Sequence, residues 1–168
     1  MKKRCGTIAI VGQPNVGKST LLNYFIGTKL SITSRKAQTT RYQLLGIHTT
    51  PETQYIFVDT PGYQLKHLNT LNKNLNKTVK QALQNVDVIL FLIEPRQMTE
   101  VDEKILQMIP EETPIILVIN KVDRLKEKSK LLELIQVFKE NERYKEIIPT
   151  SVKKKNNLKE LLESTYQF

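Results

Sequence analysis

The stretch Gly12-Gln13-Pro14-Asn15-Val16-Gly17-Lys18-Ser19 decides the fold of this chain. It matches the phosphate-loop pattern G-x-x-x-x-G-K-[ST] in full, between an apolar segment, Thr7–Val11, and a helix-like segment, Lys18–Ile26. Glycines let the backbone curl until its N–H groups point at phosphate oxygens, and the helix N-terminus adds a positive dipole end. Chance produces the pattern in roughly one chain in 200 of this length. The stretch therefore predicts a nucleotide site, with Lys18 on the phosphates and Ser19 on Mg²⁺.

Apolar segments and helix-like segments alternate along the rest of the chain. We expect strands at Thr7–Val11, Tyr42–His48, Gln54–Asp59, Val86–Ile93, Ile115–Asn120 and Ile147–Pro149, and helices at Lys18–Ile26, Thr99–Ile109, Ser129–Phe138 and Leu158–Thr165. The second and third strands pair through a turn at residues 50–53. The alternation predicts a three-layer α/β fold in one domain, residues 5–168, with a mainly parallel six-stranded sheet and one antiparallel strand. The ligand of such a sheet sits beyond the carboxyl ends of its strands.

Two further motifs end expected strands, Asp59-Thr60-Pro61-Gly62 and Asn120-Lys121-Val122-Asp123. D-x-x-G arises by chance about once in a chain of this size, but N-K-x-D in only roughly one chain in 50. We expect Asp59 to hold Mg²⁺ through a water and the N–H of Gly62 to contact the γ-phosphate. The carboxylate of Asp123 can accept two hydrogen bonds from guanine, and adenine offers neither of them. The ordered motifs predict GTP or GDP, rather than ATP, as the ligand.

The charge of the chain is unevenly spread. Its net charge is +9, and residues 1–51 hold eight Lys or Arg and no Asp or Glu. This asymmetry favours a positive face directed at phosphates, either of a nucleotide or of RNA, over a random surface bias. Residues 153–155 are all Lys, which we interpret as a solvated loop, with an RNA-phosphate patch as the alternative. The single cysteine, Cys5, cannot form an internal disulfide, which agrees with a reducing cytosol.

The sequence resembles the Era family of bacterial ribosome-assembly GTPases. Residues 12–23 resemble the whole translation-factor-related class, whereas Ser31-Ile32-Thr33-Ser34-Arg35-Lys36-Ala37-Gln38-Thr39-Thr40-Arg41 resembles the Era first switch almost letter for letter. Gly46-Ile47-His48 fits as well. The resemblance implies a P-loop NTPase G domain, a slow GTPase that uses Mg²⁺, with the small ribosomal subunit and its RNA as partners. It also implies a monomeric cytoplasmic protein with a peripheral contact at the inner membrane.

The motifs and the resemblance together define the expected site. For nucleotide binding it comprises Gly12, Asn15, Val16, Gly17, Lys18, Ser19, Thr20, Asp59, Gly62, Asn120, Lys121, Asp123, Ser151 and Val152. For Mg²⁺ it comprises Ser19, Thr40 and Asp59, and for catalysis Lys18, Thr40 and Gly62. Thr40 would be the switch threonine, with Thr39 as the alternative. At Ser151-Val152 the family usually has Ser-Ala, with the backbone N–H of the second residue near guanine O6, and the larger Val152 brings bulk towards the base.

Several features depart from the family or leave alternatives open. Era proteins carry a second, KH-type RNA-binding domain, which we do not find in this chain. Tyr63 stands where Ras-like enzymes have a water-positioning Gln, and Gln64 comes one position too late for that role. Asn15 either helps hold a K⁺ ion near the phosphates or only tolerates a turn.

Two other functions compete with a hydrolysing switch. The first is the G domain of a tRNA-modification or iron-transport GTPase, against which residues 31–41 argue. The second is a nucleotide-binding docking module without hydrolysis, against which the full set of phosphate and metal ligands argues.

Overall fold

The computed structural model describes residues 4–27, 44–58, 80 and 83–168 of the chain. The predicted site residues Thr40, Asp59 and Gly62 lie outside the described residues, as do Tyr63, Gln64 and the switch-like segment 31–41. Within the described part of the chain, no helix is long and apolar enough to cross a membrane.

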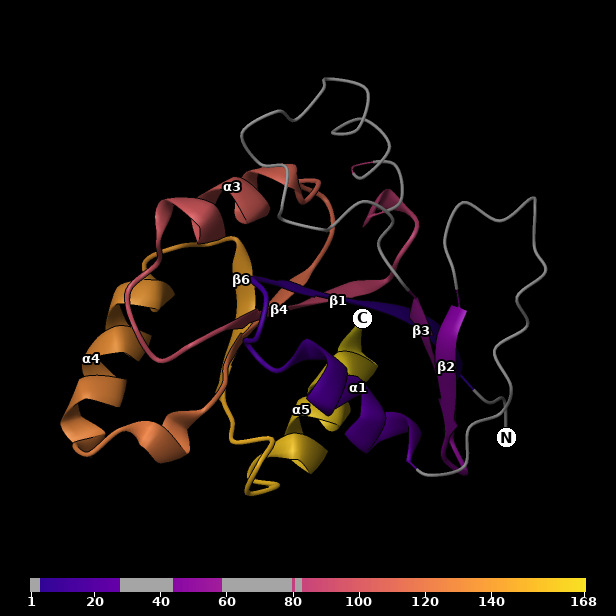
Figure 1. The fold of residues 1–168 in the computed structure, drawn as a ribbon. Helices are drawn as coiled ribbons and strands as arrows, with labels where there is room; N and C mark the ends of the chain where they lie inside the picture. Colours follow the sequence, from indigo (N-terminus) through magenta and orange to yellow (C-terminus); the bar gives the residue numbers. More distant parts are fainter. Residues whose placement is uncertain (1–3, 28–43, 59–79, 81–82) are drawn as a thin grey trace.

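Six strands form one sheet in the order β2-β3-β1-β4-β5-β6 (Figure 1). The strands are β1 (Arg4–Gly12), β2 (Leu44–Thr49), β3 (Thr53–Val58), β4 (Val88–Ile93), β5 (Ile115–Ile119) and β6 (Tyr144–Pro149). β2 and β3 pair antiparallel, and every other neighbouring pair is parallel. The predicted mainly parallel sheet with one antiparallel strand is therefore confirmed.

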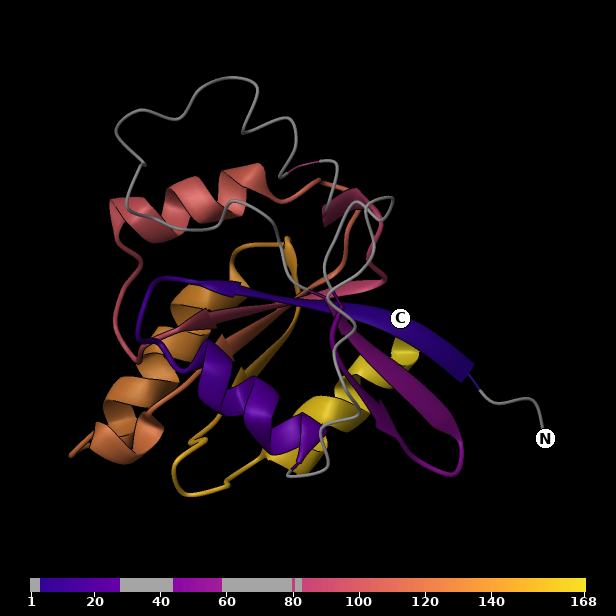
Figure 2. The same cartoon turned by 45° about the vertical axis from the view of Figure 1, so that its right-hand side comes forward.

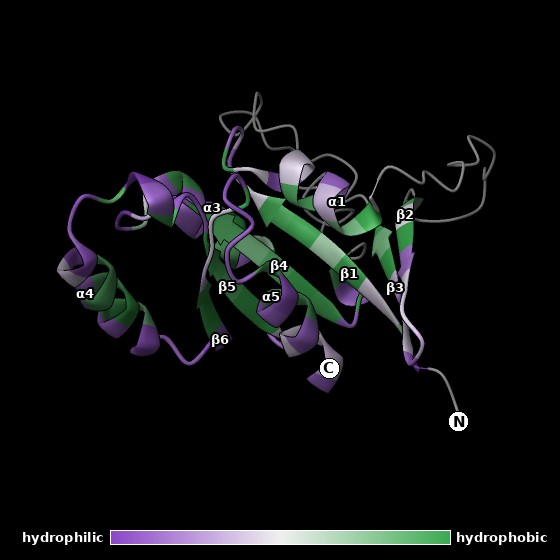
Figure 3. Ribbon diagram, turned by 90° about the horizontal axis from the view of Figure 1, so that it is seen from below, coloured by the Kyte–Doolittle hydropathy of each residue, from purple (hydrophilic) through white to green (hydrophobic). Residues whose placement is uncertain are grey.

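Helices cover both faces of this sheet, which makes the three predicted layers. Helices α1 (Lys18–Ile26) and α5 (Leu158–Ser164) pack on one face, and α3 (Glu100–Met108) and α4 (Lys128–Lys139) pack on the other (Figures 1 and 2). Successive side chains of a strand point to opposite faces. In β4, Phe91 therefore joins the core under α3 and α4, while Leu90 and Leu92 join the core under α1 and α5. Two buried faces explain why β4 and β5 are hydrophobic along their whole length (Figure 3).

Two strands, β1 and β6, begin three residues earlier than the sequence predicts. β1 begins at Arg4 rather than Thr7, because Arg4 to Ala9 pair residue by residue with β3. β6 begins at Tyr144 rather than Ile147, and its first residue pairs with Ile115 of β5. These added segments contain polar residues and no continuous apolar run, so hydrophobic patterning does not reveal them.

The ends of the helices agree better with the sequence. α1 has the predicted bounds, and it ends at Gly27, whose N–H donates to the carbonyl of Asn23. α3 begins after Thr99, which forms a capping box with Asp102, three positions later in the sequence. Local hydrogen bonding determines both helix ends, which is why the sequence alone was sufficient there.

Candidate nucleotide-binding site

The carboxyl ends of four parallel strands meet at one edge of the sheet. Gly12 of β1 lies beside Leu92 of β4, and Ile119 of β5 lies between Ile93 of β4 and Pro149 of β6. The segments that follow these strands begin at residues 13, 94, 120 and 150, so all four gather at this edge. It is the edge at which parallel α/β sheets bind their ligands.

The phosphate loop at this edge turns through residues with positive φ, which are Gly12 at 149°, Asn15 at 64° and Gly17 at 111°. A Cβ atom on Gly12 would lie 2.4 Å from the backbone oxygen of Leu92. One on Gly17 would lie 2.3 Å from Nδ2 of Asn120. Both positions therefore have no room for a side chain, and the loop has the glycine-dependent turn that phosphate binding requires. The turn interpretation of Asn15 fits its backbone, and the K⁺ interpretation stays a prediction.

Lys18, Ser19 and Thr20 form the first turn of α1, with Gly17 as the N-cap. Nζ of Lys18 donates to the carbonyl oxygens of Gly12 at 2.9 Å and Gln13 at 2.5 Å. Burial lowers the pKa of Lys18. No acidic residue lies in this turn, so the positive end of the helix dipole is available to an anion.

Asn120 connects three of the four segments that follow the parallel strands. Its side chain is buried, and its Nδ2 donates to the carbonyl of Val16 at 2.8 Å. Its Oδ1 accepts the N–H of Val152 at 3.1 Å and the hydroxyl of Thr150 at 3.4 Å. The N–H that the sequence analysis directed at guanine O6 therefore donates to Asn120 in this structure. The side chain of Val152 belongs to the apolar core under α1 and α5, which turns its bulk inward.

Asp123 and Ser151 also come together at this edge, although 28 positions separate them. The Ser151 hydroxyl donates to Oδ1 of Asp123 at 2.5 Å, and it accepts the N–H of Lys154 at 3.2 Å. The hydrogen bond from Ser151 holds the pKa of Asp123 below its usual range. Ser151 is buried and Asp123 is exposed, so a buried hydroxyl orients an ionised carboxylate at the surface.

Comparison with known proteins identifies the family of the chain. A family model described as "50S ribosome-binding GTPase" matches residues 7–121, more than half of the chain. The chain belongs to this GTPase family. GTPase Era of Nitrosomonas eutropha is 48% identical over 160 residues, which cover 95% of this chain and 54% of that protein. The chain spans about half the length of the curated relatives it matches.

Two solved Era structures share the fold of this chain. One is Era in complex with MgGDPNP and nucleotides 1506–1542 of 16S ribosomal RNA, with a TM-score of 0.76 and 43% identity. It covers 99% of this chain, which covers 57% of that one. The other is an Era variant of Aquifex aeolicus bound to GDP·AlF₄⁻, with a TM-score of 0.75, 42% identity, and coverage of 98% of this chain and 57% of that one. The resemblance to the Era family that the sequence indicated is confirmed.

One residue at this site, Glu94, belongs to none of the sequence motifs. Nζ of Lys121 donates both to Glu94 and to the backbone carbonyl of Asn15. The hydrogen bond from Lys121 lowers the pKa of Glu94. Lys121 itself has a φ of 65°, which turns its side chain out of the strand direction. The sequence does contain a signal for Glu94. It is an acidic residue directly after the apolar run of β4, and the residues that follow β1, β5 and β6 also belong to the site.

Of the expected Mg²⁺ ligands, only Ser19 belongs to the described residues, where it is exposed at the start of α1. The described residues include no group of three or more His, Cys, Asp or Glu that could hold a metal ion. A hydroxyl beside a phosphate cradle fits Mg²⁺ that is held mainly by nucleotide phosphates.

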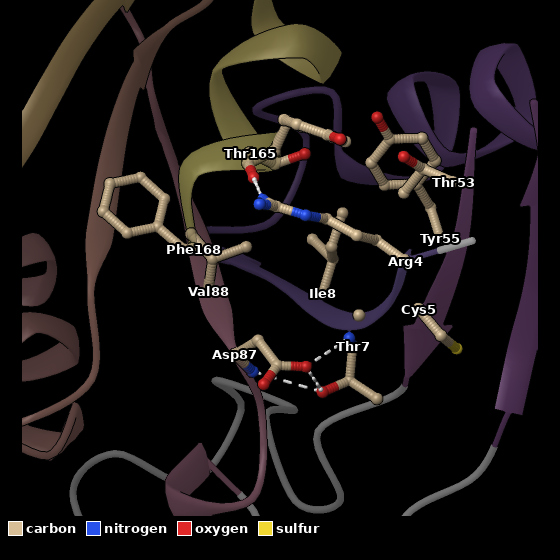
Figure 4. Close-up of a pocket in the computed structure, with 12 residues that line it drawn as sticks. Arg4, Cys5, Thr7, Ile8, Thr53, Tyr55, Asp87, Val88, Thr165 and Phe168 are labelled. Atoms are coloured by element: carbon tan, nitrogen blue, oxygen red, sulfur yellow. Dashed lines mark hydrogen bonds between the residues drawn. The ribbon is translucent and has the colours of Figure 1, made fainter. Parts of the chain in front are cut away.

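A separate pocket of about 270 Å³ lies at the amino ends of the strands, at the edge opposite the phosphate loop (Figure 4). Its polar groups bind one another: Oδ2 of Asp87 accepts the N–H and the hydroxyl of Thr7 at 2.7 and 2.8 Å. Nη1 of Arg4 donates to the backbone carbonyl of Tyr166, and Cζ of Arg4 lies 4.4 Å from the centre of the Tyr166 ring. None of the motif residues that the structure describes lines this pocket.

Proposed function

We propose that this chain is a guanine-nucleotide switch that binds GTP and GDP with Mg²⁺ and hydrolyses GTP. The Asp123 carboxylate is the observation that carries the proposal. Ser151 orients it at 2.5 Å and keeps it ionised, at the same edge of the sheet as the phosphate loop. An oriented carboxylate can accept the N1–H and the 2-amino group of guanine together, whereas adenine would leave it unpaired.

The remaining residues of the site would bind and orient the phosphates. The loop N–H groups and the α1 N-terminus attract phosphate oxygens, and Lys18 adds a full positive charge. Ser19, with Thr40 and Asp59, would hold Mg²⁺, which when bound neutralises charge on the β- and γ-phosphate oxygens. The Gly62 N–H and Thr40 would change position with the γ-phosphate and so make the switch. Hydrolysis by the chain alone would be slow, because no glutamine directly follows Gly62 to position water.

RNA of the small ribosomal subunit is the partner that we propose. An Era relative that is 43% identical was solved with a 16S ribosomal RNA fragment, and residues 1–51 of this chain are basic without a single acid. We expect its RNA affinity to be weak and salt-dependent, because basic side chains that contact phosphates give mainly electrostatic binding. We also propose a monomer in the cytoplasm with a peripheral membrane contact. Light scattering after size-exclusion chromatography tests whether the protein is a monomer. Sedimentation with anionic lipid vesicles tests the membrane contact.

Base selection tests the nucleotide assignment most directly. Titration of the protein with fluorescent GDP in Mg²⁺ buffer, followed by competition with GTP or ATP, should show displacement by GTP alone. Asp87→Asn is the matched control for Asp123→Asn, since it changes the same group at the opposite edge of the sheet. We expect the control to keep wild-type GDP affinity, while Asp123→Asn loses at least about a hundredfold, given the selectivity of such sites. Equal displacement by ATP would refute the guanine assignment.

A docking module without hydrolysis is the second candidate, and turnover separates the two. Chromatography of nucleotides after overnight incubation with GTP should show GDP accumulating above a no-protein control. No GDP above that control, in a preparation that binds GTP, would favour the docking module.

A further inference from the structure

A buried carboxylate lies behind the phosphate loop. Asp102, the third residue of α3, has 0% of its surface exposed, and no other charged side chain in the described part of the chain is buried. A carboxylate in such a place costs several kcal/mol of desolvation unless it is paired. The contacts of Asp102 therefore show which groups stabilise its buried charge.

Both oxygens of Asp102 accept hydrogen bonds, but from different elements. Oδ2 accepts the N–H and the hydroxyl of Thr99, each at 3.0 Å, and Arg96 at 2.7 Å. Oδ1 accepts Nε2 of Gln13, in the phosphate loop, at 2.8 Å. The same nitrogen of Gln13 also donates to the Thr99 hydroxyl at 2.7 Å. Burial raises the pKa of Asp102, yet these hydrogen bonds outweigh burial and leave it below its usual range, so the group is ionised.

Capping of α3 accounts for the contacts of only one of the two Asp102 oxygens. The capping box of α3 is complete with Thr99 and the Oδ2 atom. Oδ1 instead accepts one N–H of the Gln13 amide, in the phosphate loop, and the other N–H of that amide donates to the Thr99 hydroxyl. The backbone carbonyl of that same Gln13 accepts Nζ of Lys18 at 2.5 Å. One residue therefore stands between the buried carboxylate and the phosphate-binding lysine.

We infer that Asp102 and Gln13 are positioning residues that fasten the outer edge of the phosphate loop to α3 and thereby slow the release of bound nucleotide. Because Asp102 holds the side chain of Gln13, the backbone carbonyl of Gln13 stays directed at Lys18. Lys18 and the N–H groups of the loop therefore keep one arrangement. Preorganised donors bind phosphate more tightly than mobile ones, because less ordering accompanies binding. The inference rests on the proposed guanine-nucleotide function.

An isosteric series at position 13 provides the test. Gln13→Met keeps the size of the side chain without its donors, and Gln13→Glu places an acceptor against the carboxylate of Asp102. Both substitutions leave the ion pair between Arg96 and Asp102 in place. Release of fluorescent GDP, chased with excess unlabelled GDP, should be about tenfold faster in Gln13→Met, the size expected for losing a hydrogen bond to a charged group. It should be faster again in Gln13→Glu, because like charges repel.

Two further measurements separate positioning from a general loss of structure. Glu103→Gln removes an exposed acid from the same turn of α3 and should release GDP within about twofold of wild type, since exposed charges contribute little. The ratio of GDP affinity to GMP affinity should fall about tenfold in Gln13→Met, because only GDP places its β-phosphate in the loop. A general loss of structure would weaken both ligands alike and leave the ratio unchanged.

The outcomes distinguish this inference from the proposed function. A wild-type protein that binds no guanine nucleotide would overturn both. Wild-type, Gln13→Met and Gln13→Glu proteins that release GDP at the same rate would overturn the positioning role alone. Graded release with a reduced GDP-to-GMP ratio would establish it.

Discussion

Replacement of Gly17 by alanine tests whether the observed loop geometry is what binds nucleotide. Gly17 has a φ of 111°, and an added Cβ would lie 2.3 Å from Nδ2 of Asn120. The backbone conformation alone costs a non-glycine residue about 1–3 kcal/mol. Asn120 cannot move aside freely, because its buried amide donates to the carbonyl of Val16 at 2.8 Å. Loss of that bond costs a further 1–3 kcal/mol or so, about 2–6 kcal/mol in all.

The strained loop should relax in the free protein, and bound GDP would have to restore its shape. Since about 1.4 kcal/mol corresponds to a tenfold change in affinity, even the lower estimate predicts about 30-fold weaker GDP binding. Isothermal titration with GDP and Mg²⁺ measures the affinity, and denaturant unfolding monitored by circular dichroism measures stability.

Gly27→Ala is the matched control for Gly17→Ala. Gly27 also has a positive φ, 70°, but no atom of the described residues lies within 4 Å of an added Cβ, and Gly27 stands at the far end of the same helix. Its replacement should lower the unfolding free energy by about 1–3 kcal/mol and leave GDP affinity within about twofold of wild type. A folded Gly17→Ala protein that binds GDP like wild type would show that contact with Asn120 does not shape the site.

Four other predictions concern the ligands. Asp123→Asn should prefer xanthosine diphosphate to GDP in competition binding, because xanthine has a carbonyl where guanine has its amino group; an unchanged preference would contradict the base contact. Ser151→Ala should raise the pKa of Asp123, so GDP binding should fail at a higher pH than in wild type during acidification, and identical pH profiles would contradict the role of the hydroxyl. Asn15→Ala should abolish any excess of phosphate release in K⁺ over Na⁺ while GDP affinity stays nearly constant; a wild-type rate indifferent to K⁺ removes the ion from the mechanism. Anisotropy titrations with a 16S ribosomal RNA fragment should show weak binding that falls steeply with salt, and tight binding at raised salt would mean a dedicated RNA site on this domain.

The sequence by itself determined the features that depend on local chemistry or on residue type. The phosphate loop required glycines at positive φ, and the structure has Gly12 and Gly17 there. The continuous apolar runs of β4 and β5 required burial on two faces, and both strands lie in the middle of the sheet. The capping box of α3 followed from residues three positions apart. In each case the residue types and their local spacing were enough to predict the feature.

Only the tertiary structure decided which site residues touch one another. A motif names Asn120, but its contact with Val16 spans 104 positions and exists because β1 and β5 both flank β4. Gln13 and Asp102 lie 89 positions apart, and nothing local joins an amide in one loop to a carboxylate at the start of a helix. The early starts of β1 and β6 likewise depend on pairing with strands distant in the chain. Such contacts form because packing of the whole sheet and its helices brings these groups within hydrogen-bonding distance, and hydrophobic pattern and motif spacing carry no record of that packing.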